Sequence, residues 1–177
     1  MIAGSGFAAP VNTGDAPRHA LQQAYALREQ PEHRFDALQL ALSVRQRFHQ
    51  LQDGDGEAEA DYLIGVLLED RALAAWYQSQ LPAARVGLDP ALDFLVRADA
   101  LFQKSGDWVG GVKTAYEIGN VQTLLGDAVQ ACGFYRESLS RYDAGRAAQS
   151  GVEITLLGPD RRDFREVLLA SVRRACD

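Results

Sequence analysis

The segment from Ala115 to Leu139, AYEIGNVQTLLGDAVQACGFYRESL, constrains the fold more than any other part of the chain. On each side of Gly126-Asp127, apolar and small residues recur at spacings of three and four, which is the period of an α-helix. Gly126 can adopt the left-handed conformation that ends a helix, and Asp127 can cap the next one. Because the junction is so short, we expect the two helices to pack antiparallel.

Small residues mark the place where these two helices would meet. The stripe of the first helix consists of Ala115, Ile118, Gly119, Gln122 and Leu125, and that of the second helix consists of Ala131, Tyr135, Ser138 and Leu139. A glycine inside a helix costs about 1 kcal/mol relative to alanine. We therefore expect Gly119 to lie where the second helix approaches most closely, near Ala131. An ordinary helical hairpin from an unrelated bundle is the alternative interpretation.

The hairpin resembles the tetratricopeptide repeat (TPR) family. The pattern of this family places Leu-Gly in the first helix, then Ala, three residues and an aromatic residue in the second. Ile118-Gly119, Ala131 and Tyr135 stand at these spacings. Three positions depart from the pattern by lacking its Trp, Tyr and Pro: Ala115, Gln122 and Asp143.

Two further copies of the pattern precede this hairpin. Ile64-Gly65 followed by Ala91 forms a middle copy, and Ala24-Tyr25 followed by Ala37 forms a weaker first copy. The alanines of the three second helices are Ala37, Ala91 and Ala131, and the two intervals between them are unequal. Since both intervals exceed the usual period of the family, which is about 34 residues, the repeats are elongated.

The resemblance implies an all-α fold. It would be a right-handed array of antiparallel helix pairs, that is, a TPR-like α-solenoid, closed by a C-terminal capping helix. We expect a flexible N-terminal tail over residues 1–15, three helical hairpins over residues 16–148, and a linker with the capping helix over residues 149–177. Asp160 is the expected N-cap of that last helix.

Residues 70–87 form an insertion in the middle copy. Asp89-Pro90 has the sequence of a helix start, an N-cap followed by a first-turn proline, so the second helix of this copy is predicted to begin there. The helix before the insertion is apolar on nearly all sides, as expected for a helix that is fully buried or meets a partner. Leu73 and Trp76 are therefore predicted to form an interface with another subunit or partner, and packing over the chain's own core is the alternative.

Net charge, hydropathy and cysteine content restrict the partners and the cellular compartment that we expect for the protein. The net charge of −6 disfavours nucleic acid as a partner, because phosphate backbones are repelled. No apolar stretch is long enough for a membrane span, and the N-terminus lacks the features of a signal peptide, so a cytoplasmic protein is expected. Cys132 is expected to be a small buried apolar residue and Cys176 an exposed one, and no disulfide is predicted.

The sequence carries no recognisable motif for catalysis, for metal binding or for a cofactor. His19, His33 and His49 lack the spacing of metal ligands. Gly110-Gly111 lacks both the lysine and the preceding strand of a phosphate-binding loop. We therefore expect a protein that is not an enzyme and that requires neither a metal nor a cofactor.

The TPR resemblance also implies a binding groove lined by the first helix of each pair. The residues expected to line it are Tyr62, Glu69, Lys113, Tyr116, Asn120 and Thr123. Asn120 follows the helix glycine, a place from which the family often contacts peptide. Since Glu59 and Asp70 add negative charge, a basic or mixed partner segment fits better than an acidic C-terminus. A solvated helix face without a ligand is the alternative.

These expectations favour a module for protein–protein interaction. It would be a TPR-like scaffold or chaperone-type adaptor that binds a peptide or a helix of a partner, or that associates with itself as a homodimer. A regulatory sensor domain that binds a small molecule or a signalling peptide is the alternative hypothesis. An enzyme on a helical scaffold is a distant third.

Overall fold

The computed structural model describes residues 15–77, 81–154 and 163–177. These residues form seven α-helices and one short 3₁₀ helix, and no strand occurs among them. The helices are α1 (Asp15–Arg28), α2 (Arg34–Leu51), α3 (Gly54–Tyr77), α4 (Leu81–Ser105), α5 (Trp108–Leu125), α6 (Ala128–Ala148) and α7 (Phe164–Cys176), with the 3₁₀ turn at Pro31–His33. The all-α class expected from the sequence is confirmed. Residues 1–14 of the expected N-terminal tail lie outside the described residues.

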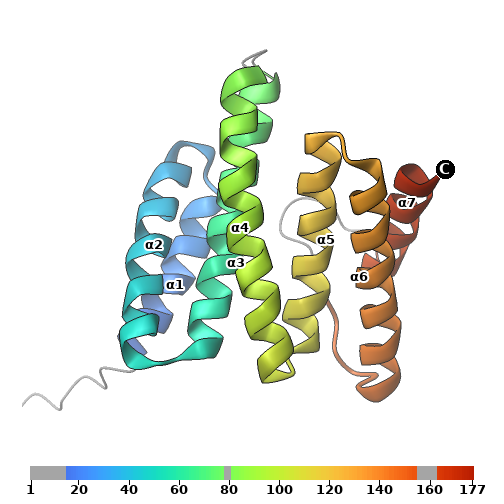
Figure 1. Ribbon diagram of the computed structural model, residues 1–177. Helices are drawn as coiled ribbons and strands as arrows, with labels where there is room; N and C mark the ends of the chain where they lie inside the picture. Colours follow the sequence, from blue (N-terminus) through green and yellow to red (C-terminus); the bar gives the residue numbers. More distant parts are fainter. Residues whose placement is uncertain (1–14, 78–80, 155–162) are drawn as a thin grey trace, which may run out of the picture.

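The helices form a row that leads from α1 and α2 at one end to α7 at the other, and consecutive helices run in opposite directions (Figure 1). Each helix packs against the one before it and the one after it. In addition, α3 contacts both α1 and α5, so these three odd-numbered helices lie together on one side of the row. No described helix has the length and apolar character needed to cross a membrane.

The even-numbered helices share one pattern of buried residues. Four positions at intervals of four, three and four face the core in each: Ala37, Ala41, Val44 and Phe48 in α2; Ala91, Leu95, Ala98 and Phe102 in α4; Ala131, Tyr135, Ser138 and Tyr142 in α6. All twelve are buried. The three alanines found from the sequence therefore occupy equivalent places in three helices, and their spacing describes a real internal repeat.

Glycines explain how closely the helices approach. A Cβ on Gly56 would stand 2.3 Å from the ring of Phe48, and one on Gly110 would stand 2.4 Å from the ring of Phe102. Each glycine N–H donates to the carboxylate of the aspartate that precedes its helix, at 2.9 Å for Asp53 and 3.0 Å for Asp107. The same junction is thus built twice, once at the start of α3 and once at the start of α5.

The contact of Gly119 differs in detail from the expected one. A Cβ on Gly119 would stand 2.6 Å from the ring of Tyr135, one turn beyond the expected neighbour Ala131. Gly65 makes the equivalent contact in the middle pair, where a Cβ would stand 2.6 Å from Leu95. Glycine is therefore needed at both positions so that a large side chain of the second helix can lie against the backbone of the first.

The start of α4 corrects a prediction. The helix begins at Leu81 and continues through Pro90, so Asp89-Pro90 does not start it. Pro90 and Val86, the residue four positions before it, are exposed, so water can satisfy the carbonyl that loses its helical hydrogen bond. The insertion at residues 70–87 lengthens α3 and α4 together, and their hairpin extends beyond the neighbouring helices (Figure 1).

The apolar character of α3 has an internal explanation. This helix is contacted by α1, α2, α4 and α5, so it is buried in the middle of the row. At its far end Ala72 is buried and Leu73 is half-buried, and Gly87 of α4 lies over Ala72. The extension therefore packs at least partly on its own hairpin. The side chain of Trp76 lies outside the described residues, so the interface predicted for it stays a prediction.

The C-terminal helix packs on α6, as expected for the capping helix. Four residues of the apolar stripe expected from the sequence are buried, Phe164, Val167, Leu168 and Ser171, and the fifth, Val172, is half-buried. Its N-cap is Asp163, whose carboxylate accepts the Arg165 N–H at 2.9 Å, and the expected cap Asp160 lies outside the described residues.

A disulfide joins Cys132 of α6 to Cys176 of α7, with Cα atoms 5.1 Å apart. The sequence-based expectation of an apolar, buried Cys132 and an unpaired Cys176 was wrong, because both residues are half-buried and bonded to each other. The bond spans 44 residues and fastens the last helix to the row.

Candidate functional site

Polar and aromatic side chains gather where the odd-numbered helices meet. We call this set the odd-helix wall: Tyr25 of α1; Glu59, Tyr62 and Glu69 of α3; Lys113, Tyr116, Glu117 and Asn120 of α5. Tyr62 and Glu69 are buried, whereas Tyr116, Glu117 and Asn120 are half-buried and reach the surface.

Hydrogen bonds connect this wall across the three helices. The Tyr25 hydroxyl donates to Glu59 at 3.1 Å, which joins α1 to α3. The Tyr62 hydroxyl lies 3.5 Å from Glu117, which joins α3 to α5. The Asn120 side-chain amide donates to the other oxygen of Glu117 at 2.8 Å. These bonds form two groups, Tyr25 with Glu59 and Tyr62 with Glu117 and Asn120, within a polar layer that lies among apolar helices.

The layer continues into α6 and α7. The Tyr135 hydroxyl of α6 donates to Asn120 Oδ1 at 2.8 Å and lies 3.1 Å from the Thr123 hydroxyl. The ring of Tyr116 packs against the rings of Tyr135 and Phe164, with centroids 5.8 and 5.5 Å away. The capping helix thus completes the wall at its C-terminal end.

Two carboxyl groups face each other at the centre of the wall. Burial, and then the charges of Glu117 and Asp70, raise the pKa of Glu69 well above its ordinary value. Burial also raises the pKa of Glu117, although Asn120 and Arg28 act in the opposite direction. The two carboxyls lie within hydrogen-bonding reach of each other. Because two carboxylates can only accept, this contact requires a proton or another cation between them.

The Glu69 carboxyl has an unsatisfied atom. Glu69 is 6% exposed, and among the described residues no donor reaches its Oε2. Its nearest basic neighbour, Arg28 of α1, donates instead to Asp70 at 3.0 Å. A buried polar atom without a partner costs roughly 1–3 kcal/mol, so this arrangement is not explained by stability.

The phenol groups around the pair are neutral donors. Burial raises the pKa of Tyr62 well above its ordinary value, and the charge of Glu117 adds to this effect. Burial likewise raises the pKa of Tyr135 to about 12. These hydroxyls therefore keep their protons at physiological pH and can donate to an anion or accept from a cationic group.

A small cavity opens on the same wall. Its volume is about 40 Å³, and it lies between Tyr25, Glu59, Tyr62 and Lys113 beside the start of α5. A cavity of this size holds little more than one water molecule. This cavity therefore cannot hold a larger ligand.

The residues predicted to line a groove fall into three groups. Lys113, Tyr116 and Asn120 lie on the wall and are half-buried, and Thr123 is exposed at its end. Tyr62 and Glu69 belong to the same layer but are buried beneath it. Of the predicted interface residues, Leu73 lies beyond the wall on the α3 extension.

Sequence reasoning missed Glu117, although a signal for it was present. Lys113, Glu117 and Asn120 follow one another at helical spacings of four and three, so Glu117 lies on the stripe that already contained the other two. Tyr25 and Tyr135 had no such signal, because their hydroxyls reach the wall from helices whose register only the packing sets.

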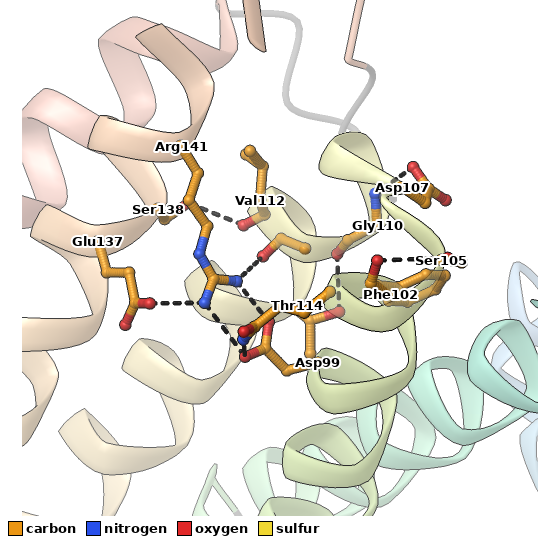
Figure 2. Close-up of polar contacts among 12 residues, drawn as sticks. Asp99, Phe102, Ser105, Asp107, Gly110, Val112, Thr114, Glu137, Ser138 and Arg141 are labelled. Atoms are coloured by element: carbon orange, nitrogen blue, oxygen red, sulfur yellow. Dashed lines mark hydrogen bonds and ion pairs between the residues drawn. The ribbon is translucent and has the colours of Figure 1, made fainter. Parts of the chain in front are cut away.

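The other side of the row carries a different kind of polar cluster (Figure 2). Arg141 of α6 donates to both oxygens of Asp99 of α4, to Glu137, and to the Gly111 carbonyl at 3.0 Å. Ser138 donates to the Val112 carbonyl at 2.8 Å, which ties α6 to α5 at the same level. Every charge in this cluster has an opposite partner.

A larger cavity lies beside the Arg141 cluster. Its volume is about 390 Å³, and it is lined by residues of α4, α5 and α6 that include Phe102, Trp108, Glu137 and Arg141. This volume falls in the range of small-molecule sites. Of its charged groups, Arg141 and Glu137 are paired with each other, and Asp107 accepts the Gly110 N–H at the start of α5.

Comparisons with known proteins assign no family to the chain: no family model, no curated protein and no solved structure matches it.

Proposed function

We propose that this protein is a non-enzymatic, TPR-like interaction module that binds a peptide or a helix of a partner protein along the odd-helix wall. The observation that carries the proposal is the layer of tyrosine, glutamate and asparagine side chains from α1, α3 and α5, in which hydrogen bonds join α1 to α3 and α3 to α5. Half-buried aromatic and amide groups of this kind suit an extended partner, because they offer contact area and hydrogen bonds together.

The internal repeat supports the same proposal. Helix pairs that bury equivalent residues at equivalent places belong to repeat architectures, in which each unit contacts only its neighbours. In such arrays one set of helices forms an extended surface for partners. The right-handed, TPR-like arrangement and a homodimeric state are parts of this proposal.

The chain offers a matched pair of sites for a direct test. Its only lysines are Lys113, which lies half-buried on the wall, and Lys104, which is exposed at the end of α4. A partner would be isolated by pulldown with mass spectrometry, and lysine acetylation would then be quantified with and without it. We expect the partner to protect Lys113 and to leave Lys104 reactive. Protection of Lys104 alone would refute the wall as the binding surface.

Charge reversal gives a second readout of the same question. Lys113→Glu is expected to weaken partner binding by changing the charge of the wall, whereas Lys104→Glu is expected to leave it unchanged. Because neither lysine makes an ion pair among the described residues, both variants are expected to fold, and circular dichroism would check this.

A second candidate function rests on the 390 Å³ cavity beside Arg141. As a sensor domain, the protein would bind a small apolar or mixed ligand there. Thermal stability would be measured against a metabolite library, since a ligand that binds only the native state raises the melting temperature. Ala144→Trp, which places a large ring in this cavity, should abolish such a shift and leave peptide binding on the wall intact.

The cytoplasmic location expected from the sequence is also a proposal. The Cys132–Cys176 disulfide weighs against it, because structural disulfides are rare in a reducing cytosol. Trapping free thiols in intact cells would decide: unmodified, oxidised cysteines would place the protein in an oxidising compartment.

A further inference from the structure

The Glu69–Glu117 pair is the least explained feature of the molecule. It is formed by residues far apart in the sequence, on two helices that meet in the middle of the row. Like charges in contact destabilise a fold unless something positive lies between them. A pair held in this way therefore indicates a place for a positive group.

The surroundings of the pair supply negative charge and leave basic groups engaged. Of the groups that act on it, Asp70 of α3 adds negative charge, and Arg28 of α1 is bound to Asp70 at 3.0 Å. Lys113 lies one helical turn before Glu117, and within the described part of the chain no ion pair joins it to the glutamates. The charge of Arg28 thus acts on both glutamates, but its hydrogen bond goes to Asp70 and leaves Glu69 Oε2 without a donor among the described residues.

Two observations beyond acidity point to a ligand. Glu69 is only 6% exposed, and its Oε2 has no donor among the described residues. The Tyr62 hydroxyl lies 3.5 Å from Glu117, and the charges of both glutamates act on the phenols of Tyr62 and Tyr116. Aromatic rings favour ammonium and guanidinium groups through cation–π attraction.

We infer that the Glu69–Glu117 pair is the anchoring subsite for a lysine or arginine side chain of the segment bound along the odd-helix wall. This inference rests on the proposed function and names the chemistry of the partner. The cationic side chain enters between half-buried Tyr116 and Asn120, and its N–H groups donate to both carboxylates and satisfy Glu69 Oε2. Without a partner, a proton shared between the two carboxyls takes the place of the cation.

Binding of the cationic side chain is therefore expected to displace the proton that the two carboxyls share. The shared proton leaves to solvent as the cationic group arrives, so the net charge of the subsite stays the same. Affinity is therefore expected to rise with pH until the pair is fully ionised in the free protein. Tyr62, Tyr116 and Tyr135 keep their protons over this range, since burial raises the pKa of each.

The test begins with a random decapeptide display library selected on the wild-type protein at neutral pH. We expect the selected peptides to share lysine or arginine at one position. The same selection on Glu69→Gln and on Glu117→Gln should lose that preference, and Glu166→Gln, which removes an exposed carboxylate of α7, should keep it.

A second measurement uses only the wild-type protein, so it does not depend on the folding of a variant. The selected peptide is compared by calorimetry with an analogue that carries norleucine in place of the shared lysine or arginine. We expect at least about a tenfold loss of affinity, as for other buried charge pairs that lose one partner. Titration in two buffers of different ionisation enthalpy should show a proton released on binding of the cationic peptide only.

The outcomes separate the two proposals. If the wild-type protein selects no peptide, both the peptide-binding function and the subsite are refuted. If it selects peptides without a shared cation, or if the norleucine analogue binds as tightly and no proton is released, the subsite is refuted and the function stands.

Discussion

The two sides of the helix row treat charge in opposite ways. On the even-helix side, Arg141 is surrounded by Asp99, Glu137 and a backbone carbonyl, so opposite charges are paired. On the odd-helix wall, two acidic side chains, Glu69 and Glu117, lie together, and burial raises the pKa of both. The first arrangement ties α4, α5 and α6 to one another, whereas the second costs stability.

A second paired cluster strengthens the contrast. Asp61 of α3 is fully buried, bonded to Arg45 of α2, and 3.7 Å from Arg97 of α4. Arg45 in α2 and Asp99 in α4 each directly follow the third residue of the buried pattern, so they occupy equivalent places in the internal repeat. Equivalent positions thus carry opposite charges and serve the same purpose of joining neighbouring helices. Both clusters pair opposite charges between helices, although Asp61 Oδ2, like Glu69 Oε2, has no hydrogen-bond donor among the described residues.

The largest expected effect comes from the disulfide that joins α7 to α6 at the C-terminal end of the row. Cys132→Ser with Cys176→Ser, or reduction, frees a loop of 44 residues in the unfolded chain. The loss is expected to be about 4 kcal/mol of unfolding free energy in the chain-entropy model. Hydrogen exchange should increase first in α7 and around Tyr116, and unchanged protection there would show that α7 docks without the bond.

The next effect tests the paired side. Arg141→Ala leaves Asp99, whose side chain is only 14% exposed, without its partner. We expect a loss of about 3 kcal/mol in urea unfolding. Arg47→Ala, on the exposed surface of α2, is the matched control and should change stability by less than about 0.5 kcal/mol. Equal effects of the two variants would mean that the Arg141 cluster does not join the helices.

A smaller effect tests the close contact beneath the wall. Gly119→Ala places a Cβ 2.6 Å from the Tyr135 ring, whose hydroxyl holds Asn120. The overpacking is expected to cost about 2 kcal/mol in thermal unfolding. Gly133→Ala in α6 meets no atom within 4 Å and should stabilise by about 1 kcal/mol through helix propensity. Opposite signs for the two glycines are the decisive result.

The last prediction concerns the Glu69–Glu117 pair itself. Burial raises the pKa of Glu69 above 4.5, so the native protein holds this proton to a higher pH than the unfolded chain does. The stability that this proton contributes is complete below the pKa of Glu69 in the unfolded chain, and it is lost as the pH rises through the pKa of Glu69 in the native protein. Glu69→Gln removes this dependence, since its amide can donate to Glu117. Between about pH 5 and 8, the unfolding free energy of the wild-type protein should fall relative to that of the variant, and the same pH dependence in both proteins would contradict this contribution of Glu69.

Much of the fold could be predicted from the sequence. The two helices on either side of Gly126-Asp127 were predicted, and their spacing placed these buried residues on facing stripes: Ala115, Ile118 and Gly119 in α5, and Ala131, Tyr135 and Ser138 in α6. The other stripe residues, Gln122, Leu125 and Leu139, are half-buried. Local signals carried this information, because a helical period and a Gly-Asp junction involve neighbours in the chain. The same reasoning failed at Pro90, where packing against α3 outweighs the local preference for a helix start.

The candidate site could be predicted only in part. Lys113, Tyr116 and Asn120 were placed on one face from their spacing, and the structure brings them to the odd-helix wall. Glu69 was expected at the surface and is buried, because the neighbouring helices α1 and α5 cover that part of α3. Spacing along one helix predicts on which face of that helix a residue lies. It does not predict where along the helix its neighbour packs, and so it does not predict which residues of that face are buried.

By itself, the sequence determined that the chain is helical, where most of its helices meet, and which stripes they bury, since these follow from propensity and period over a few turns. Tertiary structure alone decided that Glu69 meets Glu117, that Asp99 meets Arg141, and that Cys132 bonds to Cys176. Each of these contacts joins two different helices across a long stretch of chain. Such contacts depend on the register in which whole helices pack, and that register is set by the fit of all their side chains together.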